Sequence, residues 1–189
     1  AAKRIWGEGI YRLFLSHKAE VKTEVTAVKA GLREYGVSSF VAHEDIKPIK
    51  EWQNEIEAAL NSMDAFVALM TESFHDSPWT DQEVGFAFAR GVPMIAVRLG
   101  MDPYGFIGKF QALSCQWDMA PKNIAKLLIK QSRMIDAFID AAEKCGNWNH
   151  GNALSELLPE IGDLSDGQVG KLLTAYNTNR ELQGSFGFN

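Results

Sequence analysis

The chain has 189 residues, of which 46% are hydrophobic and 23% are charged, a composition typical of a soluble globular protein. This length suits one domain of ordinary size with room for a small helical addition. The 19 lysines and arginines are outnumbered by 24 aspartates and glutamates, and the net charge of -5 excludes the basic footprint that nucleic-acid binding requires. No apolar run approaches the about 20 residues that cross a bilayer, so we expect neither nucleic acid nor membrane as a partner.

The two cysteines, Cys115 and Cys145, are too few for a disulfide framework, and neither has a cysteine or histidine nearby at zinc-ligand spacing. We therefore expect reduced, buried thiols and no metal site. The first residues contain no apolar stretch of signal-peptide length. Together these features predict a cytoplasmic location.

Strand-like and helix-like runs alternate over the first 115 residues. Short apolar runs predict strands over residues 11–16, 37–42, 65–70, 93–98 and 112–115. Amphipathic or capped segments between them predict helices over residues 19–34, 52–63 and 79–90, with a short helix at 104–110. This rhythm predicts an α/β fold with a five-stranded parallel sheet and helices on both of its faces.

Beyond residue 118 the pattern is helical only. Helices are predicted over residues 121–144, 152–158 and 165–176, the last opened by the capping-box pattern Ser165-x-x-Gln168. The apolar side of the longest helix is more typical of a docking face than of a cofactor site. We expect an α/β domain over residues 1–117 and an all-helical C-terminal extension over residues 118–189 that packs on or beside it.

One edge of the predicted sheet collects three polar segments, residues 16–18, 43–51 and 73–83. Right-handed crossovers place the loops that follow parallel strands on the same edge, and ligands bind there. No G-x-G-x-x-G follows the first strand, and no Walker lysine motif occurs, so a resident nucleotide cofactor of the Rossmann or flavodoxin type is not expected.

The segment 77–87 is the most informative part of this edge. Ser77 is a good helix cap, and Pro78 suits the first helical position. Trp79 and Glu83 are four residues apart and therefore share a face of the helix. An acid beside an indole at a helix entrance favours a cationic or ring-bearing ligand. The structural alternative is a half-buried tryptophan and a glutamate that complements the helix dipole.

Three motifs, taken in order, resemble the TIR domain family, in particular its bacterial branch and the TIR proteins of Thoeris anti-phage systems. The first is Phe14-Leu15-Ser16-His17 at the end of the first strand. The second is the acidic loop His43-Glu44-Asp45-Ile46 with Trp52 behind it. The third is Ser77-Pro78-Trp79-x-x-x-Glu83. The resemblance covers roughly residues 11–115 and implies a flavodoxin-like TIR fold.

Many members of this family cleave NAD⁺ between nicotinamide and ribose, and the resemblance assigns the catalytic carboxylate to Glu83. The chemistry agrees with a single carboxylate, because nicotinamide leaves as a neutral molecule and needs no general acid. Glu83 would hold the ribose hydroxyls and stabilise the charge that develops as the bond breaks. Trp79 would form an aromatic wall against the nicotinamide or ribose.

The resemblance also implies substrate-binding roles for five further residues. Phe14 would lie beneath a ring, Ser16 and His17 near polar groups, and Asp45 and Trp52 in and behind the acidic loop, which in active assemblies reaches a neighbouring protomer. Four of them have a structural alternative: a core position for Phe14, a helix cap for Ser16, a solvated turn for His17 and a solvated loop for Asp45.

The implied partners are NAD⁺ as substrate, further copies of the chain on activation, and a downstream effector that senses the nucleotide product. Attack by water would give ADP-ribose, whereas attack by an internal nucleophile would give a cyclic ADP-ribose-type signal. By analogy with the Thoeris proteins that the motifs resemble, we expect the cyclic product. Two alternatives remain open. One is a TIR interaction module without turnover, and the other is an enzyme resembling nucleoside deoxyribosyltransferases, in which a glutamate attacks covalently.

Overall fold

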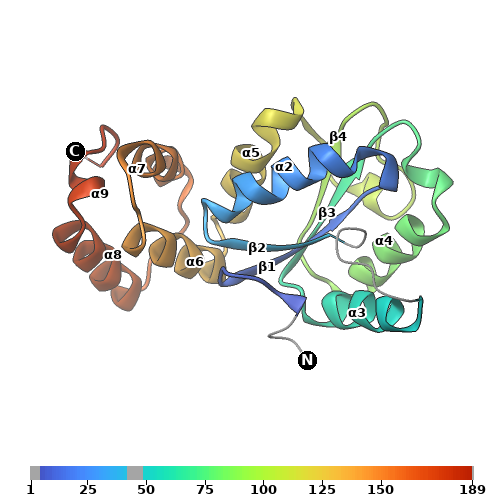
Figure 1. The fold of residues 1–189 in the computed structure, drawn as a ribbon, viewed down its shortest axis with the longest axis horizontal. Coiled ribbons are helices and arrows are strands. Elements are labelled where there is room, and N and C mark those ends of the chain that lie inside the picture. The colour runs from blue at the N-terminus through green and yellow to red at the C-terminus, as the bar shows by residue number, and fades with distance from the viewer. Residues whose placement is uncertain (1–4, 42–48, 189) are drawn as a thin grey trace.

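A computed structural model describes residues 5–41 and 49–188, with side chains described from Gln53 onward in the second of these ranges. The fold is a parallel sheet with helices on both faces, followed by a group of helices at one end (Figure 1). Because of these ranges, Asp45 and the side chain of Trp52 lie outside the described residues, and the structure does not test their predicted roles.

The sheet has five parallel strands in the order β2-β1-β3-β4-β5. Their bounds are β1 (Tyr11–Ser16), β2 (Val37–Val41), β3 (Ala65–Met70), β4 (Met94–Arg98) and β5 (Leu113–Ser114). Every residue of β3 is buried, as expected for a central strand covered on both faces. The predicted fold class and all five strands are confirmed. The chain order reverses between β1 and β3, where Ser16 pairs in register with Ala68, and this is the switch point at which such sheets bind ligands.

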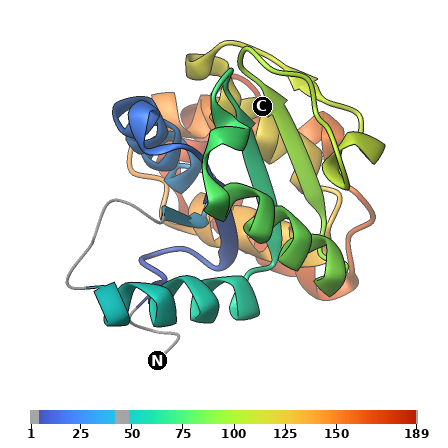
Figure 2. The same cartoon turned by 90° about the vertical axis from the view of Figure 1, so that its right-hand side faces the viewer.

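Two helices cover each face of the sheet. α2 (Lys22–Arg33) and α5 (Ala120–Leu128) pack together on one face, and α3 (Ile49–Ser62) and α4 (Pro78–Arg90) lie on the other (Figures 1 and 2). The buried residues form two clusters separated by the sheet, because successive side chains of a strand point to opposite faces. Leu13 and Leu15 belong to the α2 side, and Phe14 and Phe66 belong to the α4 side.

The C-terminal helices depart from the predicted pattern. They are α6 (Ser132–Glu143), α7 (Trp148–Ser155), α8 (Asp166–Thr178) and α9 (Arg180–Gly184). The single helix predicted over residues 121–144 was wrong, because α5 packs on α2 whereas α6 packs on β1 and α8, and one straight helix cannot reach both. The chain bends at Gln131, whose backbone is extended and whose side chain accepts a 2.6 Å hydrogen bond from the Tyr11 hydroxyl.

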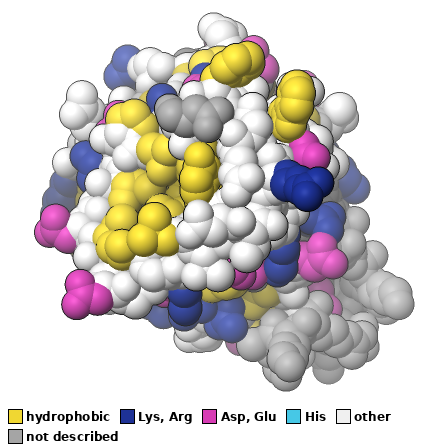
Figure 3. All heavy atoms as spheres, turned by 90° about the vertical axis from the view of Figure 1, so that its left-hand side faces the viewer, with side chains coloured by type: hydrophobic (Ala, Val, Ile, Leu, Met, Phe, Trp, Pro, Cys, Tyr) yellow, Lys and Arg dark blue, Asp and Glu magenta, His cyan; other side chains and the backbone are white. Residues whose placement is uncertain are grey.

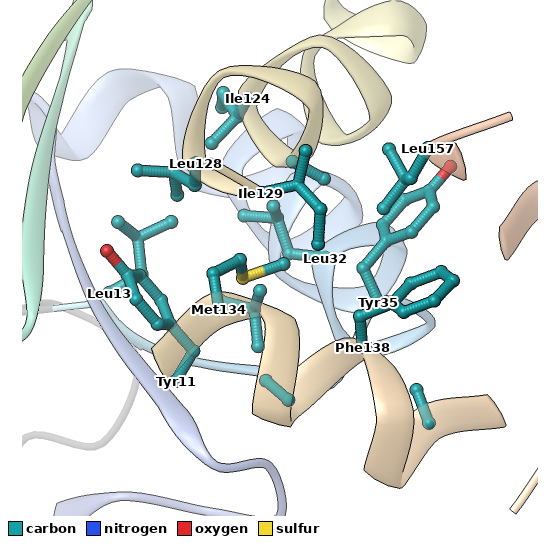
Figure 4. Packing of buried hydrophobic residues seen from close by; sticks show 14 of the residues in the cluster. Tyr11, Leu13, Leu32, Tyr35, Ile124, Leu128, Ile129, Met134, Phe138 and Leu157 are labelled. Carbon is teal, nitrogen blue, oxygen red and sulfur yellow. The ribbon is translucent and has the colours of Figure 1, made fainter. Parts of the chain in front are cut away.

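The α2 side of the sheet and the C-terminal helices share one hydrophobic cluster. Figure 4 shows Tyr11 and Leu13 from β1, Met134 and Phe138 from α6, and Leu157 from the chain after α7 around the same core. Gly36 permits the close approach: its φ is +77°, and a Cβ at this position would clash with the carbonyl oxygen of Ala137. The extension is therefore packed against the sheet. The predicted boundary at residues 117 and 118 stays a prediction.

The outer face of the C-terminal helices carries exposed apolar side chains, seen gathered in Figure 3. The large exposed hydrophobic residues of this region are Trp148, Val169, Leu173 and Phe186. Cys145 is buried, as predicted, whereas Cys115 is only half-buried. Across residues 5–41 and 49–188, no helix combines the length and apolar character that a membrane crossing requires.

Candidate functional site

Glu83 lies on the buried face of α4, although most carboxylates are exposed. The buried residues of this helix are Thr80, Glu83, Val84 and Ala87, which recur at the spacing of one helical face. The side chain of Glu83 is 4% exposed. A carboxylate has therefore taken a position that amphipathic spacing normally gives to an apolar residue.

The carboxylate of Glu83 is held by the last residue of β1. Ser16 is 1% exposed, and its Oγ donates a 2.5 Å hydrogen bond to Oε2 of Glu83. Since Phe14 and Ser16 are two residues apart on a strand, both point to the α4 side of the sheet. The contact joins the carboxyl end of β1 to α4 at the switch point of the topology.

Burial raises the pKa of Glu83 to about 7, and the hydrogen bond from Ser16 acts in the opposite direction. A buried carboxylate loses the hydration that stabilises its charge, whereas a hydroxyl that donates to it favours the ionised form. Burial therefore brings the ionisation of Glu83 from the acidic range towards neutral pH. A carboxylate with this property at a sheet edge is a candidate for chemistry rather than for simple stabilisation.

The start of α4 is fixed by the hydroxyls of one serine and one threonine. Ser77 Oγ accepts a 3.3 Å hydrogen bond from the backbone N–H of Trp79, and Pro78 occupies the first turn, as the sequence predicts. Thr80, 1% exposed, donates from Oγ1 to the carbonyl oxygen of Phe74 at 2.7 Å. Trp79 is half-buried at this start, one turn before Glu83.

Phe14 and His17 are placed differently from each other. Phe14 is completely buried and stacks on Phe66 with 5.6 Å between ring centroids, so its ring does not reach the surface in this structure. His17 is 3% exposed, with Nδ1 3.3 Å from the carbonyl oxygen of Leu15. Of the predicted residues that the structure describes, it brings Ser16 and Glu83 into direct contact. The predicted role of Phe14 beneath a ring stays a prediction.

Charged residues at the rim were not predicted from the sequence. Lys18 Nζ lies 3.0 Å from Glu20 Oε1 and 3.4 Å from Asp76 Oδ2, and Ser73 donates to Glu20 at 3.1 Å. These contacts tie the segment after β1 to the segment after β3. The convergence of the two segments followed from the topology, but the pairing of particular side chains did not.

Two further features lie along the same edge. Tyr104, from the chain after β4, donates a hydrogen bond to Asp81 in the first turn of α4. A cavity of about 450 Å³ lies beyond β4 and β5, with Arg98, Cys115 and Trp117 among its lining residues, and Glu83 does not line it. Within the described part of the chain, no group of three or more histidine, cysteine, aspartate or glutamate residues could hold a metal ion.

Comparison with known proteins adds a family match and a structural likeness. A sequence profile described as TIR domain matches residues 13–128. A similar solved structure is the TIR domain of the Toll-related receptor TRR-2 from Hydra magnipapillata, with a TM-score of 0.52 and 16% sequence identity. This likeness covers 62% of the present chain and 95% of the Hydra domain, and at this identity it shows the fold alone. No curated protein matches the chain.

Proposed function

The chain belongs to the TIR domain family, whose profile spans more than half of its length, and on this premise we propose that it is an NAD⁺-consuming enzyme. It cleaves the bond between nicotinamide and ribose. The observation that carries this proposal is Glu83, a carboxylate that is 4% exposed, hydrogen-bonded by Ser16 and placed at the switch point of the sheet.

The reaction suits a single buried carboxylate. The bond between ribose C1′ and the nicotinamide nitrogen breaks with its electron pair going to nitrogen, so the cationic ring leaves neutral and positive charge develops on the ribose. An ionised Glu83 stabilises this charge most strongly where water is excluded. Attack of water on C1′ then gives ADP-ribose and releases one proton. No general acid is required for the leaving group.

The other predicted residues take supporting roles in this proposal. Trp79, half-buried at the start of α4, forms an aromatic wall against the nicotinamide or ribose. His17, which directly follows β1, contributes a polar group near the substrate. Asp45 and Trp52 complete the substrate site from the segment after β2, in a homo-oligomer that forms on activation.

For the product and its use, we propose a cyclic ADP-ribose-type signal made in the cytoplasm during anti-phage immunity. In this case an internal nucleophile of the ADP-ribosyl group replaces water at C1′. The product is sensed by a separate effector, by analogy with the Thoeris systems that the motifs resemble. Product mass distinguishes the two outcomes, because a cyclic product lacks the elements of one water molecule.

The test is to incubate the protein with NAD⁺ at high concentration and with a crowding agent, and to resolve the products by chromatography and mass spectrometry. Glu83→Gln keeps the shape of the side chain and removes its charge, and we expect a loss of about 100-fold or more in nicotinamide release. Glu57→Gln, an exposed change on α3, is the matched control and should retain full activity. Undiminished release by Glu83→Gln would remove the assignment.

A TIR interaction module without turnover is the second candidate, and the family match to a TIR domain is equally compatible with it. Such a module releases no nicotinamide under any assembly condition. The Glu83→Gln variant of such a module would bind its partner as well as the wild type does. A deoxyribosyltransferase-like enzyme would instead act on deoxynucleosides and form a covalent glycosyl ester on Glu83, detectable by the mass of the intact protein.

A further inference from the structure

We propose that Ser16 is a positioning residue that holds the Glu83 carboxylate in its ionised, reactive form and does not bind substrate. This inference rests on the proposed function and changes the role that the family resemblance implies for Ser16. Its direct support is geometric: the two side chains are 1% and 4% exposed, and 2.5 Å separates Ser16 Oγ from Glu83 Oε2.

The hydroxyl of Ser16 has one proton to donate, and that proton is used by Glu83. A substrate oxygen could accept from Ser16 only if the buried carboxylate lost this partner, which would strongly disfavour its charge. A hydroxyl donating to a carboxylate forms a short, charge-assisted bond that is stronger than a bond between neutral groups. The structure therefore assigns Ser16 to Glu83 rather than to the ribose.

The charged groups around α4 do not supply this stabilisation. β3 contains no titratable residue, and the described titratable groups on the other elements packed against α4, or next to them in the chain, are Tyr11, Arg12, His17, Glu55, Glu57, His75 and Asp76. None of these described groups is among the causes that shift the pKa of Glu83, which are burial and the Ser16 hydrogen bond. Arg12 lies at the opposite end of β1, next to Asp64.

The position of Ser16 is itself fixed by the fold. As the last residue of β1, it pairs in parallel register with Ala68 of the buried strand β3. On the other side of the contact, Thr80 ties the start of α4 to Phe74 one turn before Glu83. Both partners of the hydrogen bond are thus held by elements that cannot shift without disturbing the sheet or the helix start.

The first experiment is the pH dependence of NAD⁺ cleavage by Ser16→Ala. Without the hydroxyl, Glu83 ionises at higher pH, so the acid limb of kcat/KM should move up by about one pH unit. This shift lowers activity about tenfold at pH 6, and the two proteins converge above about pH 9, with KM changed by less than about twofold. An unshifted limb with a raised KM would show that Ser16 contacts substrate and would overturn the proposal.

Two variants keep this measurement specific. Ser16→Thr retains a hydroxyl and should restore the wild-type limb. Ser39→Ala removes another buried serine hydroxyl, on β2, whose Oγ has no hydrogen-bond partner among the described residues, and it should leave the limb unmoved. Ser16→Cys, nearly the same size with a weaker donor, should give a smaller shift in the same direction and replaces Ser16→Ala if that variant does not fold.

A second readout does not depend on activity. The urea midpoints of wild type and Glu83→Gln are measured from pH 4 to 9. The difference between the two midpoints grows with pH and reaches a plateau above the pH at which Glu83 ionises in the native protein. In the Ser16→Ala background this plateau should begin about one pH unit higher. If NAD⁺ is not cleaved under any condition, the proposed function fails and this plateau still tests Ser16. A plateau that does not move would overturn the inference.

Discussion

The two faces of the sheet are built from similar elements and do different things. On the α2 side, buried side chains from β1, α2, α5, α6 and the last helices form one extended apolar cluster. On the α4 side the cluster is smaller, and buried polar side chains lie at its edge, including Ser16, Thr80 and Glu83. The α2 side therefore stabilises the fold, whereas burial of a carboxylate on the α4 side costs part of the folding free energy.

The most disruptive change should be on the stabilising face. Phe138 is completely buried in the cluster shared by α6 and the sheet, and Phe138→Ala removes its ring from the core. We expect a loss of about 3–5 kcal/mol in the free energy of unfolding, measured by urea denaturation. Phe186→Ala, at a side chain that is 87% exposed on the same extension, should change it by less than about 0.5 kcal/mol.

Fluorescence and circular dichroism should follow a single transition in the Phe138→Ala experiment, because the cluster joins the extension to the sheet. Two separated transitions would instead show that the extension unfolds as an independent unit, and the comparison would then be between two domains rather than two faces.

The next largest effect should have the opposite sign and lie on the α4 side. The native pKa of Glu83 is about 7 against 4.5 for an unperturbed group, so above pH 4.5 the unfolded chain releases its proton first and the protein loses stability up to pH 7. Glu83→Gln removes this loss. We expect it to be more stable by about 3 kcal/mol at pH 8 and unchanged at pH 4.

Urea unfolding at both pH values measures this difference, with Glu57→Gln as the exposed control. A Glu83→Gln protein that is less stable than wild type at pH 8 would mean that the carboxylate contributes to stability, and the contrast between the faces would not hold.

Two helix caps allow a matched comparison of smaller size. Ser77 caps α4 beside the site, and Ser165 caps α8 in the extension with a capping box. Each Ser→Ala change should cost about 1 kcal/mol in unfolding free energy. Only Ser77→Ala should also lower NAD⁺ cleavage, by several-fold, because it loosens the helix that places Trp79 and Glu83. Equal losses of activity would show that the cap acts through global stability alone.

The smallest effects are expected for two adjacent residues of the edge strand β2, whose side chains point to opposite faces. Ser38 donates a 3.4 Å hydrogen bond to the carbonyl oxygen of Gly7, whereas Ser39 Oγ is buried with no partner among the described residues. Ser38→Ala should destabilise by about 0.5–1 kcal/mol, and Ser39→Ala should be neutral or stabilising by up to about 1 kcal/mol. The difference in thermal midpoint between the two variants measures the contrast.

The parts of the fold that depend on local sequence were predictable. Apolar runs located the strands, and Ser77-Pro78 located the start of α4, because strand burial and helix capping are read within a few residues. The break at Gln131 was missed because the apolar pattern continues through it, and only the different packing partners of α5 and α6 require the bend. The five-residue helix α9 is too short to show a period.

The candidate site also has parts that local sequence predicts and parts that depend on tertiary packing. Trp79 and Glu83 could be paired from their spacing on one helix, whereas the partner of Glu83 lies 67 residues away in the chain. That contact follows from the strand order, and the pKa of Glu83 follows from its burial. Spacing alone left open whether Glu83 faces a ligand or only complements the helix dipole. Its actual place on the buried face of α4 depends on how the helix is rotated against the sheet.

The shared core also sets the order in which the protein can mature. Leu154, Leu157, Ala175 and Leu182 belong to the same cluster as Tyr11 and Leu13, so the first strand is completed by residues far along the chain. A nascent chain that already contains Ser16, Trp79 and Glu83 still lacks part of the apolar cover on the far side of β1. Contacts between residues that are far apart in the chain slow folding. The carboxylate therefore acquires its full backing only after α6 to α9 have been synthesised and have packed on the sheet.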